Sequence, residues 1–458
     1  MSQSLTINQA FELALKEHQE GNLEKAKILY EKILEINPDI PDALHLLGVI
    51  LYQNKEYEKA INKIEHALEF KTSDAGYYIN LGQAYDAFGN KEKAVKSFKK
   101  SLDVDGSHIK SYVANFYLGL FHKKIGEFNE AIKYYNKAIE LNKNLYDAYW
   151  NRGLLLLLLG RFEEGWEDYE FRLKMEKSDD KRVFNKPQWG GEVFKNKKLL
   201  VVMEQGFGDN IQFVRYLPLV KERGGEIILE CKKELLKLFK DFPGVDEIIE
   251  PENKSVPNID FYIHLMSLPR LFHTNIINIP HSTPYLKAEP ILVEKVKPLL
   301  KTNNLKVGIV WAGNPLHYND KNRSTTFENF KPLTKIHGIS FFSLQKEKFP
   351  QQMDDSKLAD LSSIMNDFSD TAALIENLDL VISVDTSVAH LAGAMNKPVW
   401  TLLPFLPEWR YLLNRPDSPW YPSMRLFRQP KPGDWDSVFI ELEKELNGLL
   451  KNRNLYRI

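Results

Sequence analysis

The chain contains little cysteine, no surplus of either charge and no long apolar run, and each shortage narrows the possible functions. Cys231 is the only cysteine in 458 residues, so an intramolecular disulfide is impossible and a thiolate metal cluster is excluded. We therefore expect a reducing compartment. The 61 lysines and arginines nearly balance the 62 aspartates and glutamates. That balance removes the electrostatic argument for nucleic acid or an anionic membrane as the main partner.

Apolar segments long enough for a membrane or a secretion signal are also missing. Leu154–Leu159 is the longest apolar run of note, far short of the roughly 20 residues that cross a bilayer. The first residues carry Glu12, Lys16 and Glu17, where a signal peptide needs an uninterrupted apolar core. We expect a cytoplasmic protein with no membrane span.

A period of 34 residues marks the first part of the chain. Ala26, Ala60 and Ala94 recur at this interval, which is typical of tetratricopeptide repeats. Small residues at these points let the two helices of a repeat approach closely. In the last unit Gly165 replaces the alanine and Trp166 follows it, as expected of a cap against the next domain. Five repeats fit, at about 7–40, 41–74, 75–108, 112–145 and 146–176.

Strands and helices alternate in the remainder, which implies parallel sheets. The clearest strands are 199–203, 226–230, 261–264, 307–311, 340–344, 380–384 and 399–403. A break at about 290–304 divides this region into two α/β halves. The predicted domains are a repeat array at 1–176, a charged aperiodic linker at 177–194, lobes at 195–295 and 296–432, and a C-terminal helix at 433–458 that packs back on the first half.

The loop after the first predicted strand, EQGFGDNIQF, is one candidate site. Gly206 and Gly208 free the backbone to turn sharply, and the following helix offers unpaired amides to a polar ligand. Asp209 projects from this loop. Aspartate is also a common helix N-cap, but two glycines at a strand end favour a functional role. The acceptor-side loop is expected to comprise Gln205, Gly206, Gly208 and Asn210.

A second strand and helix junction, ISVDTSVAHLAGA, is the other candidate site. Asp385 ends a buried strand, while Thr386 and Ser387 open a helix, so hydroxyls, amides and the helix dipole converge there. This arrangement suits a diphosphate. His390 lies one turn further, where a histidine on an apolar helix is more often a core residue than a ligand.

The loop between these junctions, VWAGNPLHYNDKNRSTTF, adds polar candidates. Asn314 follows the strand, and Arg323 is a better phosphate ligand than the neighbouring Lys321, which is expected to be solvated. Two Asp-x-Asp triplets occur elsewhere, but neither follows a strand at the candidate sites. No metal is therefore predicted.

The second half of the chain resembles glycosyltransferase family 9, the heptosyltransferase-like enzymes with a GT-B fold. The whole chain resembles bacterial proteins that join tetratricopeptide repeats to such a domain, among them repeat-bearing flagellin glycosyltransferases. The resemblance is carried by GRFEEGWEDYE, EQGFGDNIQFVRYLP, VWAGNP, NRS, SVDTSVAHLAGA, LLPF and DSPWYPSMRLFRQ. It implies an α-helical repeat solenoid followed by two Rossmann-like parallel-sheet lobes.

The resemblance also implies roles for individual residues. Asp209, after Gly208, matches the aspartate that family members use as general base. Asp385, Thr386 and Ser387 match a donor-binding Asp-Thr-Gly, with serine in place of glycine. Arg323 stands where the family has a phosphate-binding lysine, which leaves the identity of the donor open.

Together these observations predict an inverting, metal-independent glycosyltransferase that uses a nucleotide-sugar and needs no other cofactor. The repeats would hold a protein acceptor, with flagellin as one possibility. The alternatives are an enzyme like O-linked N-acetylglucosamine transferase, a transferase acting on lipopolysaccharide or another glycan, and a non-catalytic scaffold. The sequence does not identify the sugar, the nucleotide, the acceptor or the oligomeric state.

Overall fold

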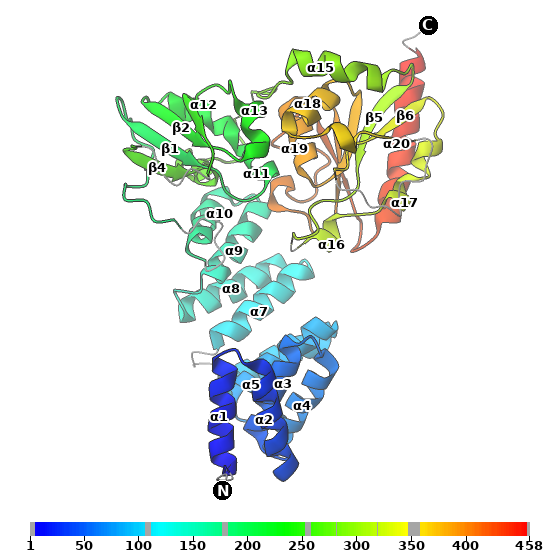
Figure 1. Cartoon of the computed structure of the whole chain (residues 1–458). Helices are drawn as coiled ribbons and strands as arrows, with labels where there is room; N and C mark the ends of the chain where they lie inside the picture. Colours follow the sequence, from blue (N-terminus) through cyan, green and yellow to red (C-terminus); the bar gives the residue numbers. More distant parts are fainter. Residues whose placement is uncertain are drawn as a thin grey trace. The chain divides into compact units, whose positions relative to one another are not determined.

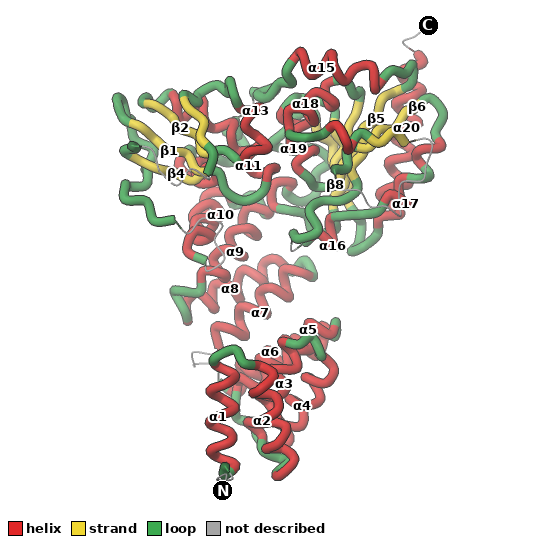
Figure 2. Tube along the Cα trace, viewed as in Figure 1, coloured by secondary structure: helices red, strands yellow, loops and turns green. Residues whose placement is uncertain are grey.

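The structure is a computed structural model that describes residues 5–105, 111–175, 182–251, 258–280, 282–317, 319–346 and 358–455 (Figure 1). Its contacts divide the chain into two compact units, Met1–Arg152 and Gly153–Ile458. The described residues of the first unit are helical, whereas the second unit holds two parallel sheets with helices around them (Figure 2).

The repeat helices come in consecutive pairs joined by short turns. Thr6 and Gln9 close a capping box at the start of the first helix. α9 (Tyr146–Leu158) crosses the division between the units, and α10 (Phe162–Tyr169) with the 3-10 helix η1 (Glu170–Lys174) belongs to the second. The preceding helices are α1 (Ile7–Gln19), α2 (Leu23–Ile36), α3 (Pro41–Gln53), α4 (Tyr57–Phe70), α5 (Ala75–Phe88), α6 (Lys91–Val104), α7 (Ser111–Lys124) and α8 (Phe128–Leu141).

Close approach within each pair explains the small residues of the repeat. Ala26, Ala60 and Ala94 have no exposed surface. A Cβ added to Gly82 would lie 2.5 Å from the Phe98 ring, so the glycine leaves room for the aromatic side chain of the partner helix. Small and large side chains therefore interlock between the helices of a pair.

The first sheet of the second unit is parallel, with strand order β3-β2-β1-β4. In the described residues it consists of β1 (Lys198–Val202), β2 (Glu226–Glu230), β3 (Glu247–Ile249) and β4 (Phe261–His264). The central strand β1 is almost wholly buried, as its apolar sequence requires. Part of the predicted linker is attached to this sheet: the Trp189 amide donates to the Tyr262 carbonyl at 2.8 Å.

The second sheet is also parallel, with order β10-β9-β8-β5-β6-β7. Its strands are β5 (Leu305–Val310), β6 (Ile339–Ser343), β7 (Leu358–Asp360), β8 (Leu380–Val384), β9 (Val399–Leu403) and β10 (Met424–Arg428). We call the parts built on the first and second sheets the first and second lobes. α20 (Trp435–Leu455) packs on the second sheet through Val438, Phe439 and Leu442, so the expectation that it packs on the first half is wrong.

Short helices fill the connections of both lobes. In the first they are α11 (Phe207–Phe213), η2 (Val214–Tyr216), α12 (Leu217–Lys221), η3 (Lys233–Leu235), α13 (Leu236–Phe239), η4 (Leu265–Ser267) and α14 (Leu268–Leu271). In the second they are α15 (Pro290–Val296), η5 (Lys297–Leu300), α16 (Asp320–Arg323), α17 (Phe327–Phe330), η6 (Leu333–Lys335), η7 (Ser362–Ile364), α18 (Phe368–Glu376), α19 (Ser387–Ala394) and η8 (Trp409–Tyr411).

The predicted fold class, a helical repeat solenoid followed by two parallel α/β lobes, is confirmed. Across the described ranges, none of the helices is both long and apolar enough to cross a membrane. The exact domain boundaries stay predictions.

Candidate functional site

The two candidate junctions meet within the second unit. α11 follows the carboxyl end of β1, α19 follows the carboxyl end of β8, and the two helices lie against each other where the lobes meet (Figure 1). Ligands of open parallel sheets collect at such strand ends. Gly208 makes the close approach possible, because a Cβ there would lie 2.8 Å from Cδ2 of His390 and 3.5 Å from the Cα of Ser387.

Asp209 occupies the third position of α11 rather than the N-cap. Its Oδ2 accepts a hydrogen bond from the Gly206 amide at 2.9 Å, which caps the helix. Its Oδ1 accepts from Nη2 of Arg410 in the second lobe, in a charge-assisted contact. The carboxylate therefore has both a local structural partner and a partner across the lobes.

Arg410 is shared between two carboxylates. Its Nη1 lies 2.7 Å from Oε2 of Glu408, while Nη2 contacts Asp209, and only 8% of the side chain is exposed. Its guanidinium carbon lies 4.5 Å from the centroid of the Trp409 ring. Burial works against the charged form, but Glu408 and Asp209 raise the pKa of Arg410 above its usual value.

Asp385 lies directly after β8 and is buried. The Tyr411 hydroxyl donates to its Oδ1 at 2.7 Å, and Nη1 of Arg323 donates to its backbone carbonyl at 3.2 Å. Arg410 and Tyr411 are neighbours in sequence, so one loop of the second lobe contacts both predicted aspartates. The structure thus brings Asp209, Asp385 and Arg323 into one neighbourhood.

His390 is a buried neutral residue of this neighbourhood. Burial lowers the pKa of His390 well below its usual value, and the guanidiniums of Arg410, Arg215 and Arg323 lower it further. The imidazole Nδ1 shares a hydrogen bond of 3.0 Å with the Tyr421 hydroxyl. Its Nε2 is 3.8 Å from Asp385, and because the ring is neutral at pH 7 this approach is not an ion pair.

The other predicted residues line the same two junctions with different exposure. Gln205 accepts from the Tyr169 hydroxyl at 3.4 Å, and Gly206 is exposed as the N-cap of α11. Asn210 is buried and donates to the Gly206 carbonyl. At the second junction, Thr386 is the N-cap of α19, its hydroxyl is bonded to Ser383, and Ser387 is the first helical residue.

Asn314 differs from these residues because its side chain forms a hydrogen bond within its own loop. It is exposed, and its Oδ1 accepts from the Leu316 amide at 2.9 Å, which forms a local turn. Among the described residues, no hydrogen bond joins Asn314 to Asp209 or Asp385. Its predicted donor role remains a prediction.

Glu408, Arg410 and Tyr411 were not identified from the sequence. Burial raises the pKa of Glu408 to about 7; the Arg410 guanidinium opposes this effect, and the carboxylates of Asp385 and Asp209 add to it. A carboxyl group that titrates near neutral pH is typical of functional sites. The sequence feature that could have pointed to them is LPEWRY, where Glu408 and Arg410 stand two residues apart after an apolar strand.

The nearby aromatic residues form the core between the lobes. Trp409, Trp420 and Tyr421 are each at most 2% exposed. Arg215 of η2 donates through Nη1 to the Trp420 carbonyl at 2.9 Å and stacks on the Tyr421 ring. These rings hold the lobes together. In the part of the chain that the structure describes, no group of three or more His, Cys, Asp or Glu side chains is arranged to hold a metal ion.

Comparisons with known proteins agree with this architecture. Residues 119–160 match the TPR repeat model, residues 19–101 match the model of anaphase-promoting complex, cyclosome, subunit 3, and residues 355–404 match glycosyltransferase family 9 (heptosyltransferase). One part of the chain thus matches tetratricopeptide repeats, and a short stretch further along matches glycosyltransferase family 9. That segment contains Asp385, Thr386, Ser387 and His390 but neither Asp209 nor Arg410.

Individual relatives extend the comparison. Protein FlbA of Caulobacter vibrioides is 24% identical over 493 residues, which cover 93% of this chain and 81% of that protein. Photosystem I assembly protein Ycf3 of Acaryochloris marina is 33% identical over 95 residues, which cover 20% of this chain and 57% of that protein. A crystal structure of MamA aligns with 35% of this chain and 92% of its own at 24% identity, with a TM-score of 0.32.

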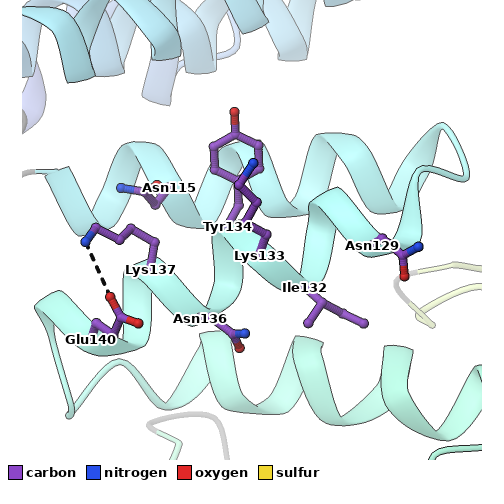
Figure 3. A pocket seen from close by; sticks show the side chains of 8 residues that line it. All are labelled: Asn115, Asn129, Ile132, Lys133, Tyr134, Asn136, Lys137 and Glu140. Atoms are coloured by element: carbon purple, nitrogen blue, oxygen red, sulfur yellow. Dashed lines mark hydrogen bonds and ion pairs between the residues drawn. The ribbon is translucent and has the colours of Figure 1, made fainter.

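The first unit has a hollow of its own on α7 and α8, of about 420 Å³. Figure 3 shows the ion pair of Lys137 and Glu140 at one end and Asn129 at the other. Amide side chains that both donate and accept are frequent in its lining. The lining residues are Asn115, Asn129, Ile132, Lys133, Tyr134, Asn136, Lys137 and Glu140.

Proposed function

We propose that this protein is a GT-B-type glycosyltransferase that moves a sugar from a nucleotide-sugar to an acceptor hydroxyl. The observation that carries the proposal is the loop at Arg410 and Tyr411, which contacts Asp209 of the first lobe and Asp385 of the second. Carboxylates from both lobes therefore serve one site, at the strand ends where ligands of parallel sheets bind.

In the proposed reaction, Asp209 accepts the proton of the acceptor hydroxyl. The hydroxyl oxygen forms a bond to the anomeric carbon while the bond from that carbon to the donor phosphate breaks, and the nucleotide leaves with the electron pair. Attack from the face opposite the leaving group inverts the centre. A carboxylate with an ordinary pKa near 4 is a weak base at neutral pH, so proton transfer belongs late in the transition state.

The second lobe supplies the charge stabilisation for the leaving group. The amides at the start of α19 and the guanidinium of Arg323 converge beside Asp385, so they offer donors to phosphate oxygens. Arginine and amide donors perform the task that a metal ion performs elsewhere, so the proposed reaction needs no metal.

The proposal is tested with the purified full-length chain and a panel of nucleotide-sugars labelled in the sugar. We expect transfer or hydrolysis for at least one donor, and a loss of about 100-fold or more in kcat for Asp209→Asn with donor binding retained. Asp417→Asn is the control, because that exposed aspartate pairs with Arg415. Full activity of Asp209→Asn would refute the base assignment, and no turnover of any donor would favour a non-catalytic scaffold.

We also propose that the repeat array holds a protein acceptor, with flagellin as one candidate. Stacked helix pairs present an extended surface for a peptide or helix, and the asparagine-rich hollow on α7 and α8 suits a peptide backbone. Deleting residues 1–145 leaves α9 and α10 whole. We expect this deletion to abolish modification of co-produced proteins, measured by intact mass, and to spare donor hydrolysis. Unchanged modification would refute the docking role.

A further inference from the structure

Arg410 has more hydrogen-bonding capacity than its protein partners use. Nη1 contacts Glu408 and Nη2 contacts Asp209, but Nε is buried and, among the described residues, has no partner. A guanidinium presents its donors in a planar fork that matches phosphate oxygens. A buried side chain of this kind at the carboxyl end of the second sheet points to an anionic ligand.

The carboxylates around Arg410 would repel the diphosphate of a nucleotide-sugar. Asp209 from α11, Asp385 from the end of β8 and Glu408 from its own loop all face it, and all three act on its pKa. Arg323 is a second cation beside Asp385, and it is paired with Asp320 at 3.4 Å. The neutral His390 of α19 adds no positive charge, and burial together with Arg323 lowers the pKa of His317 as well.

A diphosphate would bring about two more negative charges to this place. Several carboxylates and a diphosphate cannot share one guanidinium in a partly buried setting without repulsion. Either a carboxylate must leave Arg410 or one must take up a proton. Glu408 is the group placed to do so, because its Oε2 lies 2.7 Å from Nη1 of Arg410 and burial raises its pKa to about 7.

We propose, building on the proposed function, that Arg410 is a donor-phosphate ligand that releases Asp209 when the diphosphate binds, and that Glu408 is a positioning residue that becomes fully protonated in this exchange. In the free protein the Arg410 guanidinium is bonded to the Asp209 carboxylate. When a diphosphate replaces that carboxylate on Arg410, Asp209 becomes available to an acceptor hydroxyl. The proton comes from solvent and stays on the Glu408 carboxyl, so no bond other than O–H forms on the enzyme.

Neighbouring contacts hold the loop in position for this role. The Arg428 Nη2 donates to the Tyr411 carbonyl at 2.6 Å, and its Nε donates to the Arg415 carbonyl at 3.2 Å. The backbone that follows Arg410 is thus anchored to the carboxyl end of β10. The Trp409 ring supports the guanidinium from within the core. Side-chain movement, rather than loop movement, is what the exchange requires.

The test uses the full-length protein with inorganic pyrophosphate as the probe. Isothermal titration calorimetry at pH 7 in two buffers of different ionisation enthalpy measures the protons taken up on binding. We expect the wild type to take up about half a proton more per pyrophosphate than Glu408→Gln does. The difference is about half a proton because a group with a pKa near 7 is about half protonated before the probe binds. Comparison with Glu408→Gln removes the contribution of the probe's own titration.

Substitution of the arginine gives the second readout. Arg410→Lys should weaken pyrophosphate binding about tenfold or more, since a lysine cannot form the bidentate contact. Arg415→Lys is the matched control, because its guanidinium pairs with the exposed Asp417 on the same loop, and it should bind as the wild type does. Equal proton uptake by wild type and Glu408→Gln, or unchanged affinity of Arg410→Lys, would overturn the proposal.

The outcome is separable from that of the proposed function. A wild type that turns over a nucleotide-sugar but shows no Glu408-dependent proton uptake would refute the exchange and leave the transferase standing. A wild type that binds pyrophosphate with this uptake but uses no nucleotide-sugar would support the exchange and refute the transferase.

Discussion

Gly208 of the first lobe and His390 of the second lie so close that a single added methyl group would separate them: a Cβ on Gly208 would sit 2.8 Å from Cδ2 of His390. The imidazole cannot move aside freely, because it is buried and bonded to the Tyr421 hydroxyl. This contact sets the spacing of α11 and α19, and therefore the distance between the two candidate carboxylates.

Gly208→Ala should therefore disturb both stability and the site. We expect a loss of about 1–3 kcal/mol in the free energy of unfolding, as for other overpacked cores, measured by urea denaturation. Gly448→Ala is the control, since a Cβ there meets nothing within 4 Å and α20 should gain about 1 kcal/mol. A Gly208→Ala protein as stable as the wild type would show that the lobes yield easily at this contact.

Gly313→Ala should displace Arg323. A Cβ on Gly313 would lie 2.5 Å from Nη2 of Arg323, whose guanidinium now donates to the Asp385 carbonyl. The arginine is flexible, so the fold should survive while pyrophosphate affinity falls about tenfold, the value of one charge-assisted hydrogen bond. Calorimetric titration measures the effect. Unaltered affinity with normal stability would remove Arg323 from the donor site.

The Glu408 carboxyl should make stability depend on pH. Its pKa is about 7 in the folded protein, above its ordinary value of 4.5, so its stabilising contribution is complete below pH 4.5 and is lost as the pH rises through 7. The melting temperature of Glu408→Gln relative to wild type should therefore rise between pH 5 and pH 8. Glu443→Gln, on the exposed face of α20, should show no such trend. A flat difference for Glu408→Gln would contradict the shifted titration.

Trp166 should contribute strongly to the second unit. It is 2% exposed, donates through Nε1 to the Thr274 carbonyl at 2.8 Å, and meets the Trp409 ring edge-on at 5.2 Å. Trp166→Ala should cost about 3–5 kcal/mol, whereas Trp166→Phe keeps most packing and should cost about 1 kcal/mol for the lost hydrogen bond. Thermal denaturation followed by near-ultraviolet circular dichroism measures both. Similar losses for the two variants would show that the hydrogen bond dominates.

The fold was predictable where local pattern determines structure. The buried strands β1, β8 and β9 are nearly unbroken apolar runs, so their positions follow from the sequence. β10 was missed because Arg425 and Arg428 interrupt the apolar run of this edge strand. Such charges are common at sheet edges, where they find partners outside the strand; here Arg425 pairs with Glu445 of α20 at 2.6 Å.

The candidate site was predictable only in part, for a similar reason. Asp209 and Asp385 could be found because each follows an apolar strand. The ion pair between Arg410 and Asp209 joins residues 201 positions apart, and no local pattern records it. Glu408 has its shifted titration because of burial and neighbouring carboxylates, which only the assembled lobes provide.

The most direct test of whether Asp209 and Asp385 serve one site of sugar transfer is a double-mutant cycle on kcat/KM, with Asp209→Asn, Asp385→Asn and the double variant of the full-length chain. Groups that act as a unit have strongly non-additive effects. The account predicts that kcat/KM of the double variant is only slightly lower than that of the less active single variant. Two large losses that multiply independently would show that the aspartates belong to separate sites.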